Sequence, residues 1–351
     1  MIQLIEAKGF RCLRYVKCRI NSFEILVGPN ASGKSTLLDV IRFLGDLVSR
    51  GFDEAIQERS DNLKDLIWQK EGDHFEIAIE VQIPARLQTM LPQEYERCRY
   101  EVSVGIDSTS QENSILSERV LLMFEAQKSP PIQRFLFPES VTPPDTLLTS
   151  VPRKGVKTVV NKVSGGNDNF YDETGKGWDH SFKLGPRRSA LANLPEDETK
   201  FPVSTWLKRI LLDGTQNLVL NSLVMRKPSP PGLPRGFRSD GSNLPWTIEL
   251  LKKKDPDKFR RWLDHIRTAL PDIATIETIE RPEDRHRYLQ VVYGNGLTIP
   301  SWVLSDGTLR LLALTLVAYL DQQAIYYGRG TGKWDPSSSC GNSFSGPFLS
   351  L

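Results

Sequence analysis

The sequence predicts an α/β fold in which a mixed central sheet is joined to an antiparallel β lobe. A short apolar strand at residues 23–27 runs into a glycine-rich turn and then into helical spacing over residues 35–44. Residues 75–83 and 99–106 alternate with a period of two, which is typical of a pair of antiparallel strands. Helical spacing returns near the end of the chain, at residues 308–320. Strands and helices mixed in this order indicate the α/β class.

The remaining elements follow in chain order. Residues 2–7 alternate and predict a strand, and a second strand ends at residue 20. From about residue 107 to residue 186, prolines, glycines and serines accumulate, which predicts a loop-rich insertion with at most one hairpin. Beyond it we expect helices at 203–212, 244–253 and 259–270 and strands at 273–280 and 287–294.

Bulk composition narrows the class of protein. Hydrophobic residues make up 39% and charged residues 25% of the 351 residues, as in ordinary globular proteins. A formal net charge of +2 gives no global basic field that favours nucleic acid, and it leaves a local patch open. No secretory signal and no apolar run of roughly 18 residues is present. No two of the cysteines stand at CxxC spacing, so thiols in a reducing cytoplasm are expected: Cys12, Cys18, Cys98 and Cys340.

The glycine-rich turn has the pattern G-x-x-x-x-G-K-[ST], a phosphate-binding loop. Glycines at the start of a helix let backbone N–H groups surround phosphates. Lys34 is expected to reach the β- and γ-phosphates, and the Ser35 hydroxyl is expected to bind Mg²⁺. The alternative is a chance glycine-rich turn between a strand and a helix. The motif comprises Gly28, Pro29, Asn30, Ala31, Ser32, Gly33, Lys34 and Ser35.

A second motif, Leu304-Ser305-Asp306-Gly307-Thr308, stands directly before the last predicted helix. A serine and a glycine at a helix start favour an anion site, because free N–H groups and the helix dipole meet there. The alternative is a plain capped helix start with Ser305 or Asp306 as the N-cap.

Together the two motifs and the leading GFRCL segment resemble the ABC-type P-loop ATPases of the RecF, SMC and OLD-like group. The segments SALANLPEDE and DGSNLPWTIELL are similar to bacterial AAA-type ATPases. The resemblance implies ATP and Mg²⁺ as cofactors and a homodimer that sandwiches ATP. DNA or a nuclease-like effector is the implied further partner, in DNA repair or phage defence. It also implies nucleotide contacts from Gly28, Asn30, Gly33, Lys34, Ser35 and Thr36, and contacts in trans from Ser305 and Gly307 of a second copy.

Hydrolysis in this group requires an acidic pair after the second motif, one carboxylate for Mg²⁺ and one for the attacking water. After Leu320 the sequence has no such pair, and Asp335 is the only acidic residue after Asp321. No catalytic residue is therefore assigned, and we expect nucleotide binding with little or no hydrolysis. The C-terminal strands of the sheet are expected to be missing as well.

The composition of the tail suggests a reading-frame change. Permitted codons from Tyr327 onward, read one base later, encode MVEEPENGIHPRAVETVFQALSSL, which contains an acidic pair and resembles the missing segment. A natural flexible tail is the alternative. The expected organisation is an N-terminal half with the phosphate loop and antiparallel lobe, a variable insertion, a helical lobe, the second motif with its helix, and an aberrant tail: 1–106, 107–186, 187–300, 301–322 and 323–351.

Other functions and residues stay open. A non-hydrolysing nucleotide-binding regulator or a decayed fragment is the main alternative, and a small-molecule kinase is disfavoured by the second motif. Arg11 is either a nucleotide contact or a solvated arginine. The basic runs at 252–254 and 281–287 favour a solvated face over DNA contacts, because acids flank or interrupt them. The glutamine that couples Mg²⁺ to the second lobe has three candidates: Gln57, Gln69 and Gln82.

Overall fold

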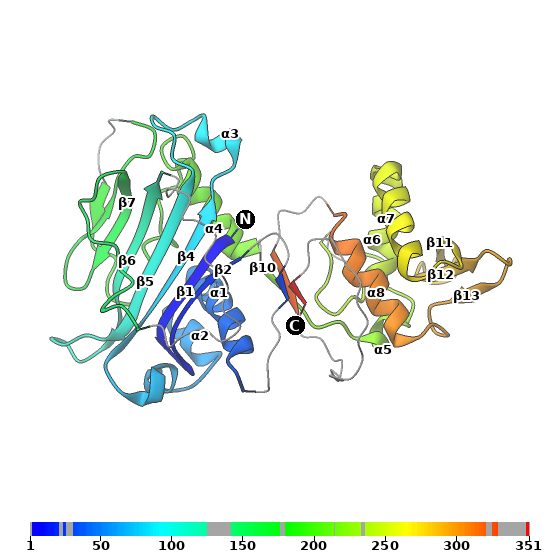
Figure 1. Cartoon of the computed structure of the whole chain (residues 1–351), viewed down its shortest axis with the longest axis horizontal. Coiled ribbons are helices and arrows are strands. Elements are labelled where there is room, and N and C mark those ends of the chain that lie inside the picture. The colour runs from blue at the N-terminus through cyan, green and yellow to red at the C-terminus, as the bar shows by residue number, and fades with distance from the viewer. Residues whose placement is uncertain are drawn as a thin grey trace. The chain divides into compact units, whose positions relative to one another are not determined.

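The computed structural model describes residues 2–20, 24–25, 31–124, 142–175, 180–213, 215–232, 236–320, 325–328 and 349–350 (Figure 1). The chain divides into two compact units. Unit 1 contains Met1–Ser22 and Val27–Thr215, and unit 2 contains Phe23–Leu26 and Gln216–Leu351. No helix in the described ranges combines the length and the apolar character that a bilayer crossing requires.

Unit 1 is built on an eight-stranded sheet with the order β2-β1-β4-β5-β6-β7-β8-β9. All of its neighbouring strands pair antiparallel. The predicted pair at 75–83 and 99–106 is confirmed as β4 and β5, with Ile77 opposite Val102. The strands are β1 Ile2–Phe10, β2 Leu13–Arg19, β4 His74–Gln82, β5 Arg97–Ile106, β6 Asn113–Met123, β7 Val156–Val163, β8 Asp168–Phe170 and β9 His180–Phe182.

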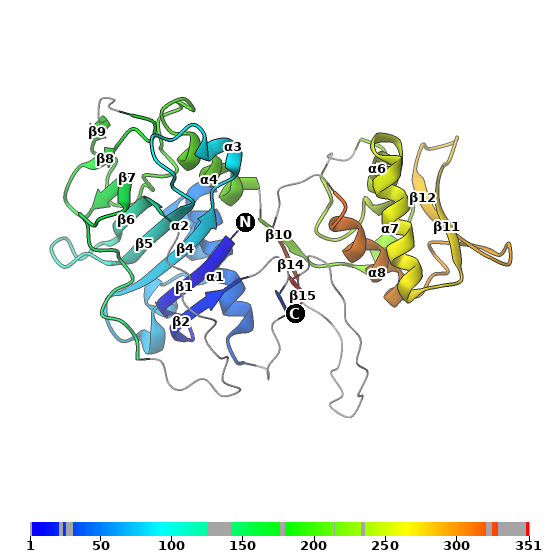
Figure 2. The same cartoon turned by 45° about the horizontal axis from the view of Figure 1, so that its top comes forward.

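The helices of unit 1 pack through an aromatic cluster. Phe43 of α1 packs against both Phe10 of β1 and Phe75 of β4, with ring centroids 5.7 and 5.4 Å away, and the two strand residues are themselves 5.0 Å apart. All three rings are buried, so α1 is fixed against the sheet by apolar area and ring packing. Helix α4 contacts α1 in turn (Figure 2). The helices are α1 Lys34–Ser49, α2 Phe52–Gln57, α3 Ala85–Gln88 and α4 Pro202–Asp213, with short 3-10 turns η1 Leu63–Leu66 and η2 Trp68–Lys70.

Glu173 anchors the start of α4. Its buried carboxylate accepts hydrogen bonds from the amides of Val203 and Ser204 at 2.6 and 2.8 Å. Burial raises the pKa of Glu173 to about 7, and the Ser204 hydroxyl and the two amides oppose that rise. A loop carboxylate thus supplies the cap that the first turn of α4 requires.

The prediction that residues 107–186 are loop-rich with at most one hairpin is wrong. This region contributes β6, β7, β8 and β9 to the sheet. Polar residues at buried positions hide these strands from pattern analysis, because they interrupt the apolar alternation. Glu118 of β6 is fully buried, and Lys162 of β7 is buried in an ion pair with Asp168 at 2.8 Å.

Charged side chains on β1, β4 and β5 hold a segment of that same region against the sheet. Arg99 joins Glu6 at 2.6 Å and Glu101 at 2.6 Å. Glu76 accepts from the amide of Leu147 at 2.6 Å, and Glu101 accepts from the amide of Thr149 at 2.9 Å. These carboxylates are buried, but each forms the ion pair or the hydrogen bonds given above. Those contacts offset the cost of removing the charges from water.

Unit 2 has a helical core against a three-stranded antiparallel sheet. Trp262 is fully buried, and its indole N–H donates to the Thr315 hydroxyl at 3.0 Å. The helices predicted at 244–253, 259–270 and 308–320 are confirmed, as are the two predicted strands. The elements are α5 Ser222–Met225, α6 Leu244–Lys254, α7 Pro256–Ala269, α8 Asp306–Val317, β11 Ile273–Glu280, β12 Arg287–Tyr293 and β13 Thr298–Pro300.

A small sheet with the order β10-β14-β15-β3 contains the parallel pairs. The strand expected at 23–27 is β3 Glu24–Ile25, parallel to β15 Leu349–Ser350. Strand β14 Ile325–Gly328 also lies in the tail, and β10 is Thr215–Leu218. The prediction that strands after Leu320 are missing is therefore wrong for these two short segments. The Ile-Tyr-Tyr run of β14 has high strand propensity, and this short run is hidden by the overall Gly- and Ser-rich composition of the tail. The expected mixed sheet is divided into an antiparallel sheet and a separate small one.

Candidate nucleotide-binding site

The phosphate-loop motif leads directly into α1. Gly28, Pro29 and Asn30 lie outside the described residues. Ala31 has φ 64° and Gly33 has φ 88°, so two left-handed residues within three positions turn the backbone into the helix. Gly33 is the N-cap and supplies no side-chain cap.

The first turn of α1 presents a positive helix end. The first intrahelical bond runs from the Leu37 amide to the Gly33 carbonyl at 2.9 Å, so the amides of residues 34–36 have no acceptor within the helix. The turn also contains no acidic residue. Lys34 adds a cation and donates to the Ser32 hydroxyl at 3.1 Å, and Ser35 is exposed. The N–H groups of the first turn, the helix dipole and a lysine together favour an anion at this position.

The turn between β1 and β2 is docked on this helix end. Cys12 Sγ lies 3.1 Å from the hydroxyl of Thr36, whose side chain is buried. A Cβ atom at Gly33 would lie 3.0 Å from Leu13 Cδ2, tighter than nine in ten real contacts, so the Leu13 side chain would have to shift by a few tenths of an ångström. Glycine at position 33 is favoured mainly by its positive φ, and the close approach of Leu13 adds to that preference.

Arg11 and two residues that the sequence analysis missed form an ion-pair cluster beside α1. Arg11 Nη1 lies 2.9 Å from Asp39 Oδ2. Arg59 Nη2 lies 2.8 Å from Asp39 Oδ1, and Arg59 Nη1 lies 2.9 Å from Asp46 Oδ2. Residues 11, 39 and 59 are far apart in the chain and match no motif, so no sequence pattern could have revealed them. Arg11 lies in a turn and its side chain is 42% exposed, as in the solvated alternative, but it also has a defined partner in Asp39.

The second motif forms the start of α8 in unit 2. Ser305 is the N-cap, and its hydroxyl accepts from the Thr308 amide at 3.1 Å. Asp306 pairs with Arg226 at 2.6 Å. Gly307 has open space, since a Cβ there would meet only Ser305 Oγ, at 3.9 Å. The capped helix start of the sequence analysis is present, with Ser305 rather than Asp306 as the cap.

The sequence itself decides the family. Residues 1–281 match the AAA ATPase domain family, which is well over half of the chain and includes the whole phosphate-loop motif. The chain belongs to the AAA ATPase domain family. Membership implies nucleotide binding, in agreement with the helix end described above. No curated protein matches the chain.

Solved structures similar to this AAA ATPase domain include SMC heads and RecF. An Smc head bound to the C-winged helix domain of ScpA has 16% identity and a TM-score of 0.47, over 93% of this chain and 80% of that one. The SMC head domain from Thermotoga maritima has 10% identity and a TM-score of 0.41, over 93% and 76%. RecF with ATP has 12% identity and a TM-score of 0.28, over 96% and 88%. These TM-scores are low, so the family membership rests on the sequence match.

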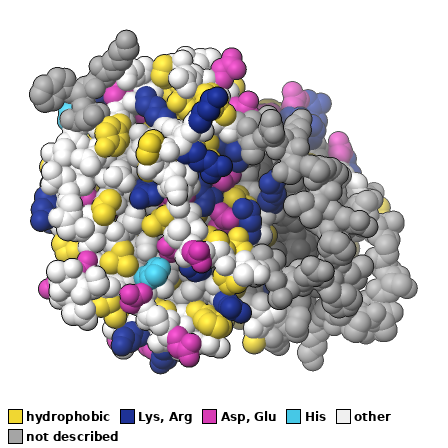
Figure 3. Space-filling view, turned by 60° about the vertical axis from the view of Figure 1, so that its left-hand side comes forward, with side chains coloured by type: hydrophobic (Ala, Val, Ile, Leu, Met, Phe, Trp, Pro, Cys, Tyr) yellow, Lys and Arg dark blue, Asp and Glu magenta, His cyan; other side chains and the backbone are white. Residues whose placement is uncertain are grey.

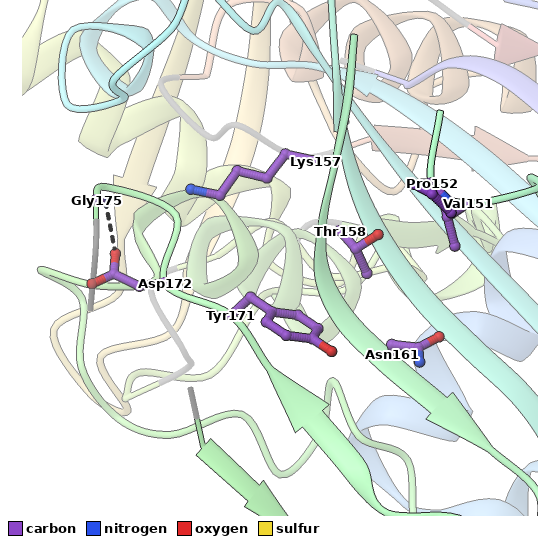
Figure 4. Close-up of a pocket in the computed structure, with 8 residues that line it drawn as sticks. All are labelled: Val151, Pro152, Lys157, Thr158, Asn161, Tyr171, Asp172 and Gly175. Atoms are coloured by element: carbon purple, nitrogen blue, oxygen red, sulfur yellow. Dashed lines mark hydrogen bonds between the residues drawn. The ribbon is translucent and has the colours of Figure 1, made fainter. Parts of the chain in front are cut away.

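A cavity of about 480 Å³ lies elsewhere in unit 1 of the AAA ATPase domain protein (Figure 4). Asp172, which lines it, accepts from the Gly175 amide at 3.1 Å. None of the predicted nucleotide-binding residues lines it, so it is separate from the α1 site. Its lining is Val151, Pro152, Lys157, Thr158, Asn161, Tyr171, Asp172 and Gly175.

Neither a metal site nor a basic surface for nucleic acid is evident in the described ranges. No group of three or more histidine, cysteine or acidic side chains stands in a metal-binding arrangement there. On the face in Figure 3, basic side chains lie beside acidic ones. Within the two basic runs, Lys253 pairs with Glu249 at 3.0 Å and Arg287 pairs with Glu280 at 2.7 Å. Lys253, whose side chain is 71% exposed, fits the solvated face that the sequence predicts, whereas the Arg287 side chain is only 9% exposed and does not.

Proposed function

We propose that this AAA ATPase domain protein binds ATP with Mg²⁺ at the N-terminus of α1. The observation that carries the proposal is the start of α1, where two left-handed residues lead into a helix with a glycine N-cap and no acidic residue in its first turn. In this arrangement the amides from residue 33 onward hold the phosphates, Lys34 neutralises the β- and γ-phosphates, and Ser35 binds Mg²⁺. The loop residues Gly28, Pro29, Asn30, Ala31 and Ser32 complete the cradle, and Thr36 supports it from within.

Titration calorimetry with ATP, ADP and AMP, each with Mg²⁺, tests this proposal. The expected affinity falls in the order ATP, ADP, AMP. Each phosphate that the nucleotide lacks is one negative group fewer to interact with the helix end and with Lys34. Equal affinities, or no binding of any of the three, would overturn the proposal.

Binding without efficient hydrolysis is the second part of the proposal. The sequence after Leu320 contains no paired carboxylates to bind Mg²⁺ and to activate water. An ATP turnover of about one per second is within the ordinary range for enzymes. Turnover at that rate would contradict this part if it also disappeared in Lys34→Ala. A non-hydrolysing nucleotide-binding regulator fits the same observation. Resequencing the locus tests the proposed frameshift, and with it the aberrant tail proposed at 323–351.

We further propose that ATP joins two copies of the chain, with Ser305 and Gly307 of one copy contacting the nucleotide of the other. The resemblance to RecF- and SMC-type ATPases supports this arrangement, as does the exposed start of α8. Such a cytoplasmic dimer would act on DNA or on a nuclease-like effector in repair or phage defence.

Gly307→Asp is expected to abolish ATP-dependent dimerisation without destabilising unit 2. The site has room for the side chain, and an acid in the first turn of a helix is favourable, so the free energy of unfolding should change by less than about 0.5 kcal/mol. Ser305→Ala is the contrasting variant, since loss of the cap should cost about 1 kcal/mol. Sedimentation velocity with and without ATP, beside thermal unfolding, gives both readouts. A Gly307→Asp chain that dimerises with ATP like the unmodified chain rules out the contact in trans.

A further inference from the structure

Asp39 on α1 holds two arginines that differ sharply in burial. Arg59 Nε donates to both Asp39 oxygens at 3.0 Å, and its side chain is 4% exposed. Arg11 makes one contact with the same carboxylate at 2.9 Å, and its side chain is 42% exposed. One carboxylate therefore has a fixed partner and an exchangeable partner.

The cluster remains neutralised when Arg11 leaves it. Arg59 also pairs with Asp46 at 2.9 Å and donates to the Ala55 carbonyl at 2.7 Å, and its guanidinium lies 5.2 Å from the centre of the Phe43 ring. These contacts fix Arg59 in place. Asp39 thus keeps a counter-ion in either state, so release of Arg11 leaves no unpaired buried charge.

Asp39 lies on the same face of α1 as Ser35, because residues four apart in a helix are neighbours. With a rise of 1.5 Å per residue, the two positions are separated by about 6 Å along the axis. Side chains lean toward the helix N-terminus, which brings the Asp39 carboxylate and the Arg11 guanidinium nearer the phosphate end.

The backbone of Arg11 is fixed, whereas its exposed side chain is held by a single ion pair with Asp39. Arg11 has φ 52°, and its amide donates to the Leu66 carbonyl at 2.7 Å. A left-handed non-glycine residue persists only where its surroundings hold it, and the docked turn with Cys12 and Leu13 provides that constraint. Arg11 can therefore move only through its side chain. Its partner Asp39 lies one helical turn from Ser35.

We propose that Asp39 is a positioning residue that holds Arg11 beside the phosphate site, and that bound nucleotide competes with Asp39 for the Arg11 guanidinium. This inference rests on the proposed function. Because a guanidinium binds phosphate more strongly as the phosphate charge rises, the exchange favours the triphosphate over the diphosphate. Asp39 then sets how much charge the nucleotide must carry to draw Arg11 away.

A double-mutant cycle on Arg11→Gln and Asp39→Asn tests the exchange, with Kd for ATP and ADP measured by calorimetry with Mg²⁺. Asp39→Asn alone is expected to tighten ATP binding by about two- to fivefold, because the competing carboxylate is gone. Arg11→Gln is expected to weaken ATP binding more than ADP binding. In the Arg11→Gln background, Asp39→Asn should leave Kd unchanged. Asp46→Asn is the matched control, since it removes the other acidic partner of Arg59 without touching Arg11, and Kd should stay as in the unmodified chain.

An equal effect of Asp39→Asn in both backgrounds would overturn the inference, as would the same effect from Asp46→Asn. If Asp39→Asn does not fold, the ratio of ATP to ADP affinity in Arg11→Gln decides: a fall supports the exchange and an unchanged ratio refutes it. The proposed function fails separately, if the unmodified chain binds neither nucleotide. Binding that is intact but uncoupled to Arg11 and Asp39 overturns this inference alone.

Discussion

Lys34→Ala is expected to weaken ATP binding by about 1.5–3 kcal/mol, roughly 10- to 150-fold in Kd. The reason is that Lys34 is the cation in the first turn of α1, where the amides of residues 34–36 have no acceptor within the helix. Removing it leaves those amides to hold a polyphosphate without its counter-charge. Calorimetric titration with ATP and Mg²⁺ measures the change.

Two further variants separate this effect from general electrostatics. Lys64→Ala removes an exposed lysine on η1 and should leave Kd within error. Lys34→Arg keeps the charge but not the shape of the ammonium group, so partial loss is expected. Equal losses in Lys34→Ala and Lys64→Ala would show that only overall charge matters, and that the α1 end is not the binding site.

Glu118→Ala is expected to destabilise unit 1 by about 3–5 kcal/mol, which is a large part of the stability of a typical domain. Glu118 is fully buried on β6 and accepts from the Tyr100 hydroxyl at 2.8 Å and the Ser189 hydroxyl at 2.7 Å. It also accepts from the amides of Ala190 and Leu191, at 2.6 and 3.0 Å. Truncation leaves these four donors buried without their acceptor, and it opens a cavity.

Urea unfolding followed by circular dichroism measures the loss, and two variants calibrate it. Glu118→Gln keeps one acceptor oxygen, so an intermediate loss is expected. The exposed Glu112→Ala should change the free energy of unfolding by less than about 0.5 kcal/mol. A Glu118→Ala chain as stable as Glu112→Ala would mean that the segment at 189–191 is not held by this carboxylate.

Apolar periodicity predicted the elements with one buried face, and it failed where polar groups are buried. Helices α4, α6, α7 and α8 and the pair of β4 and β5 were predicted because their apolar residues recur at the spacing of their structure. Strands β6 and β7 were missed because Glu118 and Lys162 occupy buried positions, where Glu118 accepts from an amide 72 residues away and Lys162 pairs with Asp168 on the neighbouring strand β8. Such partners exist only after folding, so no local pattern signals them.

The candidate site shows the same division. The described part of the phosphate-loop motif leads into α1 as the sequence predicted. The positive φ of Gly33 and the place of Lys34 in the first turn depend only on the local sequence. The cluster of Arg11, Asp39 and Arg59 depends on the docking of a β-turn and of the segment after α2 onto α1, which are tertiary contacts. The role of Ser305 and Gly307 stays a prediction, since it concerns a second copy of the chain.

Hydrogen–deuterium exchange with and without ATP and Mg²⁺ tests the central claim most directly, because it locates the bound phosphates along the chain. Amides that bind phosphate exchange slowly, so peptides that cover Gly28–Leu37 should be protected on addition of ATP, and the protection should disappear in Lys34→Ala. Peptides of the remote cavity, around Lys157 and Tyr171, should be unaffected. Protection that appears at that cavity and not at the start of α1 would contradict the account.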